Sequence, residues 1–370
     1  MSAKEDGEQE LSTDQLIRFA RHLSLPQVGQ VGQLKLQNAR VCVVGAGGLG
    51  APIIQYLAAA GVGMLTVIDN DVVSASNLQR QVIYRTADIG SSKSRTSAEV
   101  FRQMNPTGTC NAVEARITGQ NAAELLKGHD VVVDGSDNFE TRYVVSDAAS
   151  ELGIPHVWGS VFRFEGQVAV FTPESATYRD LYPEQPPAAL STSCEAGGVL
   201  GVLCGTVGSL MATEVVKALL GMKSELEGAV LIYDAEKTSF DLRGVPKETR
   251  PPAAQPVPMA AIDVEEVDCQ WLRSAMLSDN PPLVLDVREG FELEISSLPG
   301  ARHRPLGSIL LAEGLDEGLR NREIVTVCKS GMRSGRAARR LNELGAAEAR
   351  SLRGGLDAWR AEVDPTMAAY

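Results

Sequence analysis

Residues 41–63 constrain the fold more than any other stretch of the chain. They read VCVVGAGGLGAPIIQYLAAAGVG: an apolar run, then Gly45, Gly47 and Gly50 in the spacing G-x-G-x-x-G, then an Ala-rich helical pattern. A buried strand that turns tightly into a helix has this pattern, and the N–H groups at such a helix N-terminus bind phosphate. The pattern is typical of NAD or FAD enzymes, but alone it indicates a nucleotide turn without identifying the nucleotide.

Strand-like and helical stretches alternate around this turn. Residues 14–38 have a helical pattern, and the apolar runs at 64–71 and 130–138 predict buried strands with helices between them. Such alternation is typical of a parallel, doubly wound sheet, so we expect an α/β, Rossmann-like nucleotide-binding domain.

The next segments predict that this sheet is mixed. Residues 160–172 alternate apolar and polar side chains around Glu165 and Gly166, which predicts an antiparallel hairpin. A long apolar helix is expected within 197–220, and one final strand within 228–240.

Composition divides the chain into segments. Residues 244–258 hold five prolines among fifteen residues, so we expect a semi-extended, Pro-rich linker at 244–260. It separates a first domain at 11–243 from a smaller α/β domain at 261–370. The acidic residues 1–10 lack an apolar core, so they predict a disordered tail and no signal peptide.

Charge and cysteine content exclude several classes of protein. The net charge of -12 opposes binding to nucleic acid or to anionic membranes, and no run of 18 apolar residues predicts a membrane span. The cysteines form no C-x-x-C pair, which favours a cytoplasmic protein with reduced thiols over a disulfide scaffold. The six are Cys42, Cys110, Cys194, Cys204, Cys269 and Cys328.

Polar residues at other strand ends favour a particular nucleotide. Asp69 ends the strand after the turn, where a carboxylate accepts hydrogen bonds from the ribose of NAD or ATP alike. Asn77, Arg80 and Lys93 follow, and a triphosphate needs such added donors and cations more than a pyrophosphate does. Each residue alone also suits a solvated surface, but their joint placement favours ATP. The candidate Mg²⁺ ligands are Asp134 and Asp137.

The order of these motifs resembles the ubiquitin-activating-enzyme-like family, in its molybdopterin-synthase and thiamine sulfur-carrier adenylyltransferase branch. The resemblance covers residues 11–242 and rests on RFARHLSLPQVGQVGQLKLQNARVCVVGAGGLG, IDNDVVSASNLQRQVIY, GSSKS and DGSDNFETRY. It implies that ATP adenylates the C-terminal glycine of a ubiquitin-like protein, releasing pyrophosphate. It also implies a homodimer in which Arg21 reaches the neighbouring subunit's ATP site, with Mg²⁺ on Asp137 and Arg80 among the catalytic residues. The implied ATP-binding residues are Gly45, Gly47, Gly48, Gly50, Asp69, Ser76, Asn77, Arg80, Lys93, Asp137 and Asn138.

Two further positions depend on the same resemblance. Family members commonly bind a structural zinc through two C-x-x-C pairs, but here Thr177 and Asp180 stand at the first pair, and residues 242–248 lack cysteine. We therefore predict no zinc. Cys194 aligns with a family cysteine that forms a thioester or disulfide with the carrier; a small, semi-buried loop residue is the alternative.

Cys328 has the surroundings of a reactive sulfur. It follows an apolar strand and begins CKSGMR, a loop that enters a basic helix and presents N–H groups to an anion. Such a loop, with Lys329, Arg333 and Arg336 nearby, favours a thiolate or persulfide, although a buried structural cysteine is the alternative. The remaining loop residues are Ser330, Gly331 and Met332.

This second domain resembles the rhodanese family over residues 264–359. The cysteine loop, LVLDVRE, LPGARHRPLGSI and LRGGLDAW carry the resemblance. It implies that Cys328 carries sulfur as a persulfide, and the C-x4-R spacing to Arg333 favours sulfur transfer over phosphate hydrolysis. We expect Asp286 and Arg288 to form a structural ion pair.

Together the two domains predict one two-step reaction. The first activates the carboxylate of a ubiquitin-like sulfur carrier ending in Gly-Gly, and the second supplies sulfur to give a C-terminal thiocarboxylate. The sulfur donor is a cysteine desulfurase or thiosulfate, and molybdopterin, thiamine, thiolated tRNA and cysteine synthesis all remain open. The alternatives are an NAD- or FAD-dependent oxidoreductase fused to a sulfurtransferase domain, and a non-catalytic carrier-binding scaffold.

Overall fold

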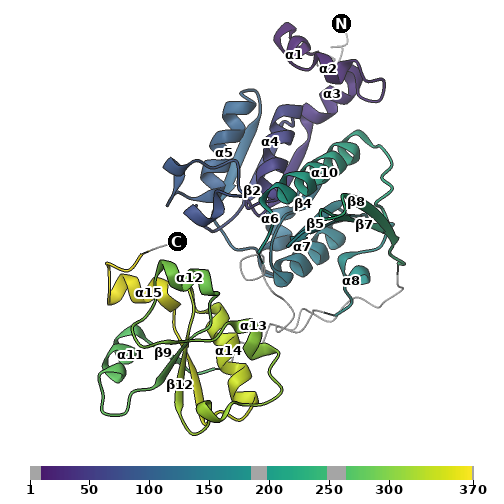
Figure 1. Cartoon of the computed structure of the whole chain (residues 1–370). Helices are drawn as coiled ribbons and strands as arrows, with labels where there is room; N and C mark the ends of the chain where they lie inside the picture. Colours follow the sequence, from purple (N-terminus) through teal and green to yellow (C-terminus); the bar gives the residue numbers. More distant parts are fainter. Residues whose placement is uncertain (1–9, 185–197, 248–263, 369–370) are drawn as a thin grey trace, which may run out of the picture. The chain divides into compact units, whose positions relative to one another are not determined.

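The computed structural model describes residues 10–184, 198–247 and 264–368 (Figure 1). These residues form two compact units, one on each side of the Pro-rich segment. The predicted tail (1–10) and linker (244–260) fall largely outside the described residues, as does Cys194.

The first unit contains one mixed sheet of eight strands. Its order is β3-β2-β1-β4-β5-β6-β7-β8. The first five strands in this order are parallel, and β6, β7 and β8 continue the sheet in antiparallel fashion. Chain order reverses between β1 and β4, which is the point where doubly wound sheets bind ligands. The strands are β1 (Arg40–Val44), β2 (Met64–Ile68), β3 (Thr109–Val113), β4 (Val131–Asp134), β5 (His156–Phe162), β6 (Glu165–Phe171), β7 (Ala229–Asp234) and β8 (Ser239–Gly244).

Helices cover both faces of the parallel part, because alternate residues of each strand belong to different cores. Val41 and Val43 pack on the side of α4, α5 and α10, whereas Cys42 and Val44 pack on the side of α6 and α7. This confirms the predicted doubly wound arrangement. The helices are α1 (Thr13–Arg18), α2 (Ala20–Leu23), α3 (Gly29–Asn38), α4 (Gly50–Ala60), α5 (Lys93–Met104), α6 (Ala122–Leu126), α7 (Phe139–Leu152), α8 (Tyr178–Leu181) and α10 (Gly201–Leu220).

The antiparallel part confirms one prediction and corrects another. The hairpin of β5 and β6 is present, but it turns at Arg163, whose φ is 54°, two residues before the predicted Glu165. The single strand predicted at 228–240 is wrong, because β7 and β8 form a second hairpin there. The turn between them has no glycine; Asp234 instead accepts the N–H groups of Glu236 and Lys237.

Among the described helices, α10 is long and apolar enough to cross a membrane by length and composition. Its close packing accounts for this composition. Gly208 lies against Pro52 of α4, and Met211 fills the space that a side chain at Gly159 of β5 would need. We therefore describe α10 as a core helix that joins the sheet to α4.

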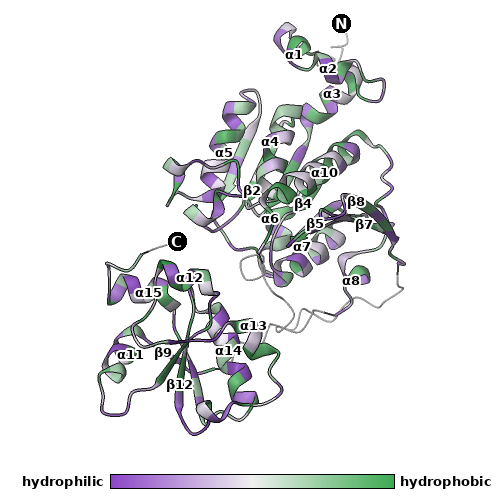
Figure 2. Cartoon of the chain, in the orientation of Figure 1, coloured by the Kyte–Doolittle hydropathy of each residue, from purple (hydrophilic) through white to green (hydrophobic). Residues whose placement is uncertain are grey.

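The second unit contains a parallel sheet of five strands in the order β11-β10-β12-β13-β9. Apolar strands run through its centre, and hydrophilic residues lie on the outer faces of its helices (Figure 2). Successive residues Leu283 and Val284 belong to separate cores on the two faces of the sheet. The elements are β9 (Glu266–Val267), β10 (Leu283–Asp286), β11 (Arg302–His303), β12 (Glu323–Val327), β13 (Glu348–Leu352), α11 (Cys269–Met276), α12 (Gly290–Ile295), α13 (Leu306–Leu310), α14 (Met332–Glu343) and α15 (Gly355–Glu362).

Candidate nucleotide and sulfur-transfer sites

The glycine loop lies at the reversal point of the first sheet. Gly45 follows β1 with a φ of 87°, in the left-handed region that favours glycine. A Cβ at Gly45 would lie 3.2 Å from the carbonyl oxygen of Gly135, the residue after β4. A Cβ at Gly50 would lie 2.1 Å from the carbonyl oxygen of Gly45. The loop is therefore folded tightly against the end of β4, and α4 begins directly from it.

Asp69 holds this loop in place. Its two carboxylate oxygens accept the N–H groups of Ala46 and Asp71, both at 2.8 Å. Burial raises the pKa of Asp69, and the Lys93 charge and these two hydrogen bonds counteract that rise. Each oxygen retains a second lone pair, so the carboxylate can also accept a ribose hydroxyl.

Lys93 is a buried cation close to the same loop. It begins α5, and its Nζ lies 2.8 Å from Oδ2 of the exposed Asp71. Sequence reasoning missed Asp71, although it lies two residues after Asp69. An exposed carboxylate of this kind leaves the lysine charge available for exchange onto a phosphate.

Arg80 and Asn77 occupy the segment after Asp71. The Arg80 guanidinium donates to the Ser76 carbonyl at 3.0 Å, and its side-chain stem lies beside Gly48 of the glycine loop. Asn77 is buried, and its side-chain oxygen accepts the Ser74 N–H at 3.2 Å. The structure thus brings Arg80 to the loop, whereas the Asn77 side chain also has a local capping role.

The polar residues in and near the DGSDN turn after β4 differ in burial and in role. Asp134 is fully buried and accepts the Ser136 N–H at 2.8 Å, so it fixes the turn. Asn138 caps α7 by accepting the Thr141 N–H. Arg142, which sequence reasoning missed, is buried and donates twice to the Ser136 carbonyl, at 3.1 and 3.2 Å.

Asp137 is exposed in this turn and is the carboxylate that suits Mg²⁺. The described residues contain no group of three or more His, Cys, Asp or Glu that could hold a metal. Mg²⁺ commonly uses one or two carboxylates together with substrate phosphates, so a single exposed carboxylate fits such an ion.

Arg21 lies away from the glycine loop of its own chain. It is exposed on α2, and the neighbouring Phe19 packs against Gly61 at the C-terminal end of α4. The glycine loop is at the other end of this 11-residue helix, about 16 Å away.

The residues at the family's zinc positions do not fit zinc. Thr177 and Asp180 bond to each other, since Asp180 accepts both the N–H and the hydroxyl of Thr177 at the start of α8. Neither supplies a thiolate or an imidazole.

Aromatic packing stabilises this region. The buried Tyr178 ring lies 5.0 Å from that of Tyr143 and 5.1 Å from that of Trp158, and Val245 joins the same core from the segment after β8. Arg179 of α8 binds the Asp147 carboxylate through two hydrogen bonds of 2.7 Å. We call Tyr143, Trp158, Tyr178 and Val245 the aromatic clasp.

In the second unit, Cys328 lies at the end of β12 with its sulfur among hydrogen-bond donors. Its Sγ accepts the N–H groups of Gly331 at 3.2 Å and Ser334 at 3.3 Å. Gly331 has a φ of 94° and begins α14, so the loop wraps around the sulfur. Donors fixed in this way stabilise a sulfur anion.

Arg333 was expected to add positive charge near the Cys328 sulfur, but its guanidinium is paired with a carboxylate. Its guanidinium makes hydrogen bonds of 2.6 and 2.7 Å to the two carboxylate oxygens of the buried Glu292 on α12. Its charge is therefore balanced locally, and the contacts of the sulfur include two backbone N–H groups. Glu292 was not identified from the sequence.

One other prediction concerns structural residues. The ion pair of Asp286 and Arg288 is confirmed: both side chains are fully buried, 2.6 Å apart, and Arg288 also donates to the Ser296 carbonyl. The first turn of α15 holds the cysteine loop, since the Leu356 N–H donates to the Cys328 carbonyl.

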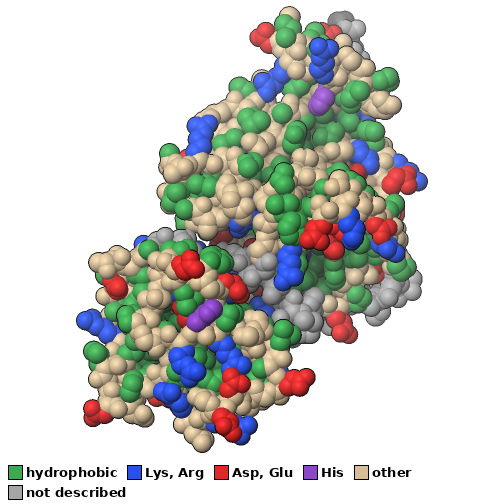
Figure 3. Space-filling view, viewed as in Figure 1, with side chains coloured by type: hydrophobic (Ala, Val, Ile, Leu, Met, Phe, Trp, Pro, Cys, Tyr) green, Lys and Arg blue, Asp and Glu red, His purple; other side chains and the backbone are tan. Residues whose placement is uncertain are grey.

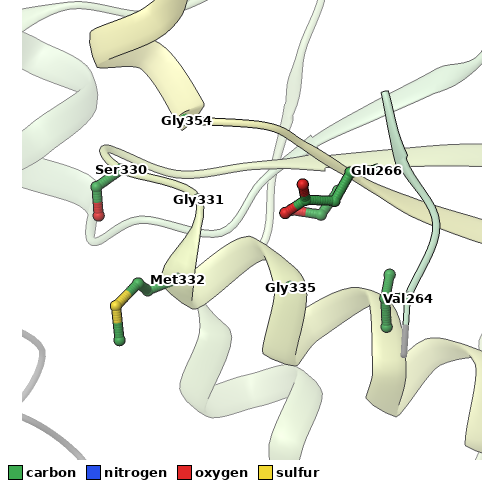
Figure 4. Close-up of a pocket in the computed structure, with 8 residues that line it drawn as sticks. Val264, Glu266, Ser330, Gly331, Met332, Gly335 and Gly354 are labelled. Atoms are coloured by element: carbon green, nitrogen blue, oxygen red, sulfur yellow. The ribbon is translucent and has the colours of Figure 1, made fainter. Parts of the chain in front are cut away.

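A cavity of about 180 Å³ lies beside the cysteine loop (Figure 4). The Glu266 carboxylate points from β9 toward the loop, and Val264 lies next to the helix that carries Gly335. The lining residues are Val264, Glu266, Ser330, Gly331, Met332, Gly335, Ser351 and Gly354.

The five cysteines in the described part of the chain form no disulfide and are all buried. Burial raises the thiol pKa of Cys42 well above its usual range, that of Cys110 to about 12, and that of Cys269 to about 11. These three thiols hold their protons at neutral pH.

Comparison with protein families matches both units. Residues 19–254 match the ThiF family, and residues 268–362 match the rhodanese-like domain. The "Probable adenylyltransferase/sulfurtransferase MoeZ" of Mycobacterium tuberculosis is 40% identical, over 97% of this chain and 96% of its own. The "Adenylyltransferase and sulfurtransferase MOCS3" of Bos taurus is 36% identical, over 97% and 89%.

Other relatives match mainly the first unit. The "SAMP-activating enzyme E1" of Haloferax volcanii is 48% identical over 65% of this chain and 88% of its own. Among solved structures, the Microcin C7 biosynthetic enzyme MccB with N-formylated MccA matches with a TM-score of 0.57 and 18% identity. That match covers 63% of this chain and 73% of the MccB chain, and it shows a shared fold.

Proposed function

Because the chain belongs to the ThiF family and carries a rhodanese-like domain, we propose that its two units activate a sulfur-carrier protein and then sulfurate it. The chain is an adenylyltransferase and sulfurtransferase, as are the relatives that it matches over nearly their whole length. The main support for sulfur transfer is the Cys328 sulfur, which accepts hydrogen bonds from two backbone N–H groups in the rhodanese-like unit.

In the first step, the C-terminal glycine carboxylate of the carrier attacks the α-phosphate of ATP, and pyrophosphate leaves. The glycine loop would bind phosphates through its N–H groups, and Asp69 would accept the ribose hydroxyls. Arg80 and Lys93 would stabilise negative charge as the α–β bond breaks. Mg²⁺ bound at Asp137 would supply further positive charge to the phosphates.

Arg21 would complete this site in a homodimer. Its distance from the glycine loop of its own chain supports a role in the partner's site. Exposed apolar residues beside the glycine loop support such an interface, since Val82 is 63% and Val202 is 71% exposed. They lie on segments in close contact, because a Cβ at Gly201 would meet the Gln79 carbonyl oxygen at 2.2 Å.

In the second step, the outer sulfur of a Cys328 persulfide would attack the acyl carbon, and AMP would leave. Release of the thiocarboxylate then leaves Cys328 bonded to a second thiol, for which Cys194 is our candidate. The carrier would end in Gly-Gly, and a cysteine desulfurase or thiosulfate would supply the sulfur. Such a protein would act in the cytoplasm, in molybdopterin, thiamine, thiolated-tRNA or cysteine synthesis.

The alternatives have less support. Three of the four histidines bond structural groups: His22 bonds Gln33, His129 bonds Thr66, and His303 bonds the Arg288 carbonyl. His156 is buried in the sheet, so none of the four histidines is available as the acid–base group of a hydride transfer. On the face shown in Figure 3, basic and acidic side chains are interspersed on both units, which does not suggest a nucleic-acid footprint.

The test separates the two steps. We expect carrier-dependent exchange of pyrophosphate into ATP for the intact protein, and its loss in Lys93→Ala. Cys328→Ala should retain exchange but lose sulfur transfer from thiosulfate, and intact mass should show one oxygen of the carrier replaced by sulfur only when both activities are present. Absence of exchange with every Gly-Gly-ended carrier tried would overturn the proposal.

A further inference from the structure

The Cys328 sulfur has a third polar neighbour besides its two backbone donors. The hydroxyl oxygen of Ser334, on the first turn of α14, lies 3.4 Å from Sγ. This distance is within hydrogen-bond range for sulfur. Cys328 is 1% exposed and Ser334 is fully buried, so water does not compete for this contact.

The Ser334 hydroxyl has a choice of acceptors. Its oxygen lies 2.9 Å from the Gly331 carbonyl oxygen and 2.9 Å from the hydroxyl oxygen of Ser351. It carries one proton, so it donates to only one of its three neighbours at a time. The state of Ser351 therefore influences where the Ser334 proton points.

Ser351 reaches this site from a different element. It lies on β13, is fully buried, and is separated from Ser334 by 17 residues. We propose that Ser351 is a positioning residue that donates its proton to the Ser334 oxygen, so that Ser334 donates its own proton to an anionic Cys328 sulfur. The inference rests on Cys328 being the sulfur-carrying residue of the proposed function.

The Ser334 hydroxyl would stabilise negative charge throughout sulfur loading. Cys328 is charged as the attacking thiolate before the step and as the persulfide after it. With thiosulfate as donor, the Cys328 thiolate attacks the outer sulfur, and a new S–S bond forms at Cys328. The S–S bond of thiosulfate breaks, and sulfite leaves with its electron pair. One negative charge stays on the outer sulfur of the persulfide, so no oxidant or reductant is required.

The cavity beside the loop supports the same arrangement. Ser351 is one of its lining residues, so the serine pair spans the distance between the cavity and the sulfur. A volume of about 180 Å³ has room for several water molecules, each of which occupies roughly 30 Å³. Ser351 itself is fully buried, so its hydroxyl contacts Ser334 rather than this water.

Charged groups around the loop also influence the thiolate, and the test leaves all of them unchanged. They come from the loop, from α14, and from the elements packed against them. They are Lys329, Arg333 and Arg336, with Glu292 on α12, Asp286 and Arg288 at the end of β10, Glu266 on β9, and Asp357 on α15.

The experiment compares Ser351→Ala and Ser334→Ala with the full-length wild type. The rate of Cys328 carbamidomethylation by iodoacetamide is measured against pH from the mass of the Cys328 peptide. We expect Ser334→Ala to move the midpoint upward by about one pH unit, the size of one hydrogen bond to an anion. Ser351→Ala should produce part of that shift, and Ser351→Thr, which keeps the hydroxyl, should restore the wild-type midpoint.

Sulfur-transfer kinetics provide a second readout, and an exposed serine provides a control. The pH profile of kcat/KM for sulfur transfer from thiosulfate to cyanide should shift in the same direction. Ser278→Ala removes an exposed hydroxyl that bonds only the nearby Ala275 carbonyl, so it should leave both profiles unchanged. If Ser351→Ala matches the wild type in both profiles, the inference is wrong. If the wild type itself transfers no sulfur from any donor, the proposed function fails instead.

Discussion

At the scale of single residues, the burial of His156 makes the stability of the fold depend on pH. It lies on β5, and within the described structure neither ring nitrogen has a hydrogen-bond partner. Its Nε2 is 3.9 Å from Oδ2 of the buried Asp134. Burial lowers the pKa of His156 to about 3, so the native state keeps this ring neutral.

This depressed pKa predicts acid sensitivity. Unfolded histidine has a pKa of about 6.5, so between that pH and about 3 the unfolded state binds a proton that the native state does not. The free energy of unfolding should then fall with decreasing pH, by up to about 1.4 kcal/mol per unit. In His156→Leu, the loss between pH 7 and pH 5 should be smaller by roughly 2 kcal/mol. Urea unfolding at several pH values would measure it, and parallel curves for the two proteins would contradict it.

Residues named by a local motif could be predicted, and residues that act through tertiary contact could not. Asp69, Arg80 and Lys93 could be proposed as site residues from the sequence because each stands at a motif position near a strand or helix end. Arg142 and Ser351 carry no such mark, since their partners lie on the turn after β4 and on α14. Asn138, which was predicted at the nucleotide, also caps α7, as an Asn before a helix commonly does.

At the scale of elements, the first turn of α15 shapes the cysteine loop. A Cβ at Gly355 would lie 2.4 Å from the Cys328 carbonyl oxygen and 2.7 Å from the Gly331 nitrogen. Gly355→Ala should therefore displace the loop and lower sulfur transfer at least tenfold, while pyrophosphate exchange is retained. Gly345→Ala is the matched control: its φ of 91° is equally unfavourable, but no atom lies within 4 Å of its Cβ. Equal activities in the two variants would show that α15 does not shape the loop.

The aromatic clasp predicts a response to truncation and to metal removal. Tyr178→Ala removes a buried ring, which typically costs about 3–5 kcal/mol, so the Tm of the first unit should fall by roughly 10 °C. Tyr178→Phe keeps the ring and should retain most of the stability. Because the clasp contains no thiolate ligands, EDTA should leave the wild-type Tm unchanged in calorimetry. A clear drop with EDTA would mean that a metal holds this region.

Element types were largely predictable, whereas some boundaries were not. The strand, glycine turn and helix at residues 41–63 follow from a strong local pattern. The β7–β8 hairpin was missed because Asp234 and Thr238 make its turn without the glycine that usually marks one. The clasp was not foreseeable, since Tyr178 and Val245 meet only when two distant segments pack together.

At the scale of the whole molecule, the proposed homodimer predicts complementation between two inactive proteins. Arg21→Ala and Lys93→Ala should each abolish pyrophosphate exchange. If Arg21 serves the partner's site, a mixed dimer has one site with both defects and one intact site. Co-refolding equal amounts should then restore about a quarter of the wild-type exchange. No recovery, despite mixed dimers seen by native mass spectrometry, would mean that Arg21 serves the site of its own chain.

The burial of the remaining thiols has a consequence for a protein that handles reactive sulfur. Sulfane sulfur passes to any accessible thiolate, so a carrier of it risks modifying itself. Cys42, Cys110 and Cys269 are buried and hold their protons. Under the proposed function, sulfur loaded at Cys328 would therefore meet no competing thiolate at these three positions.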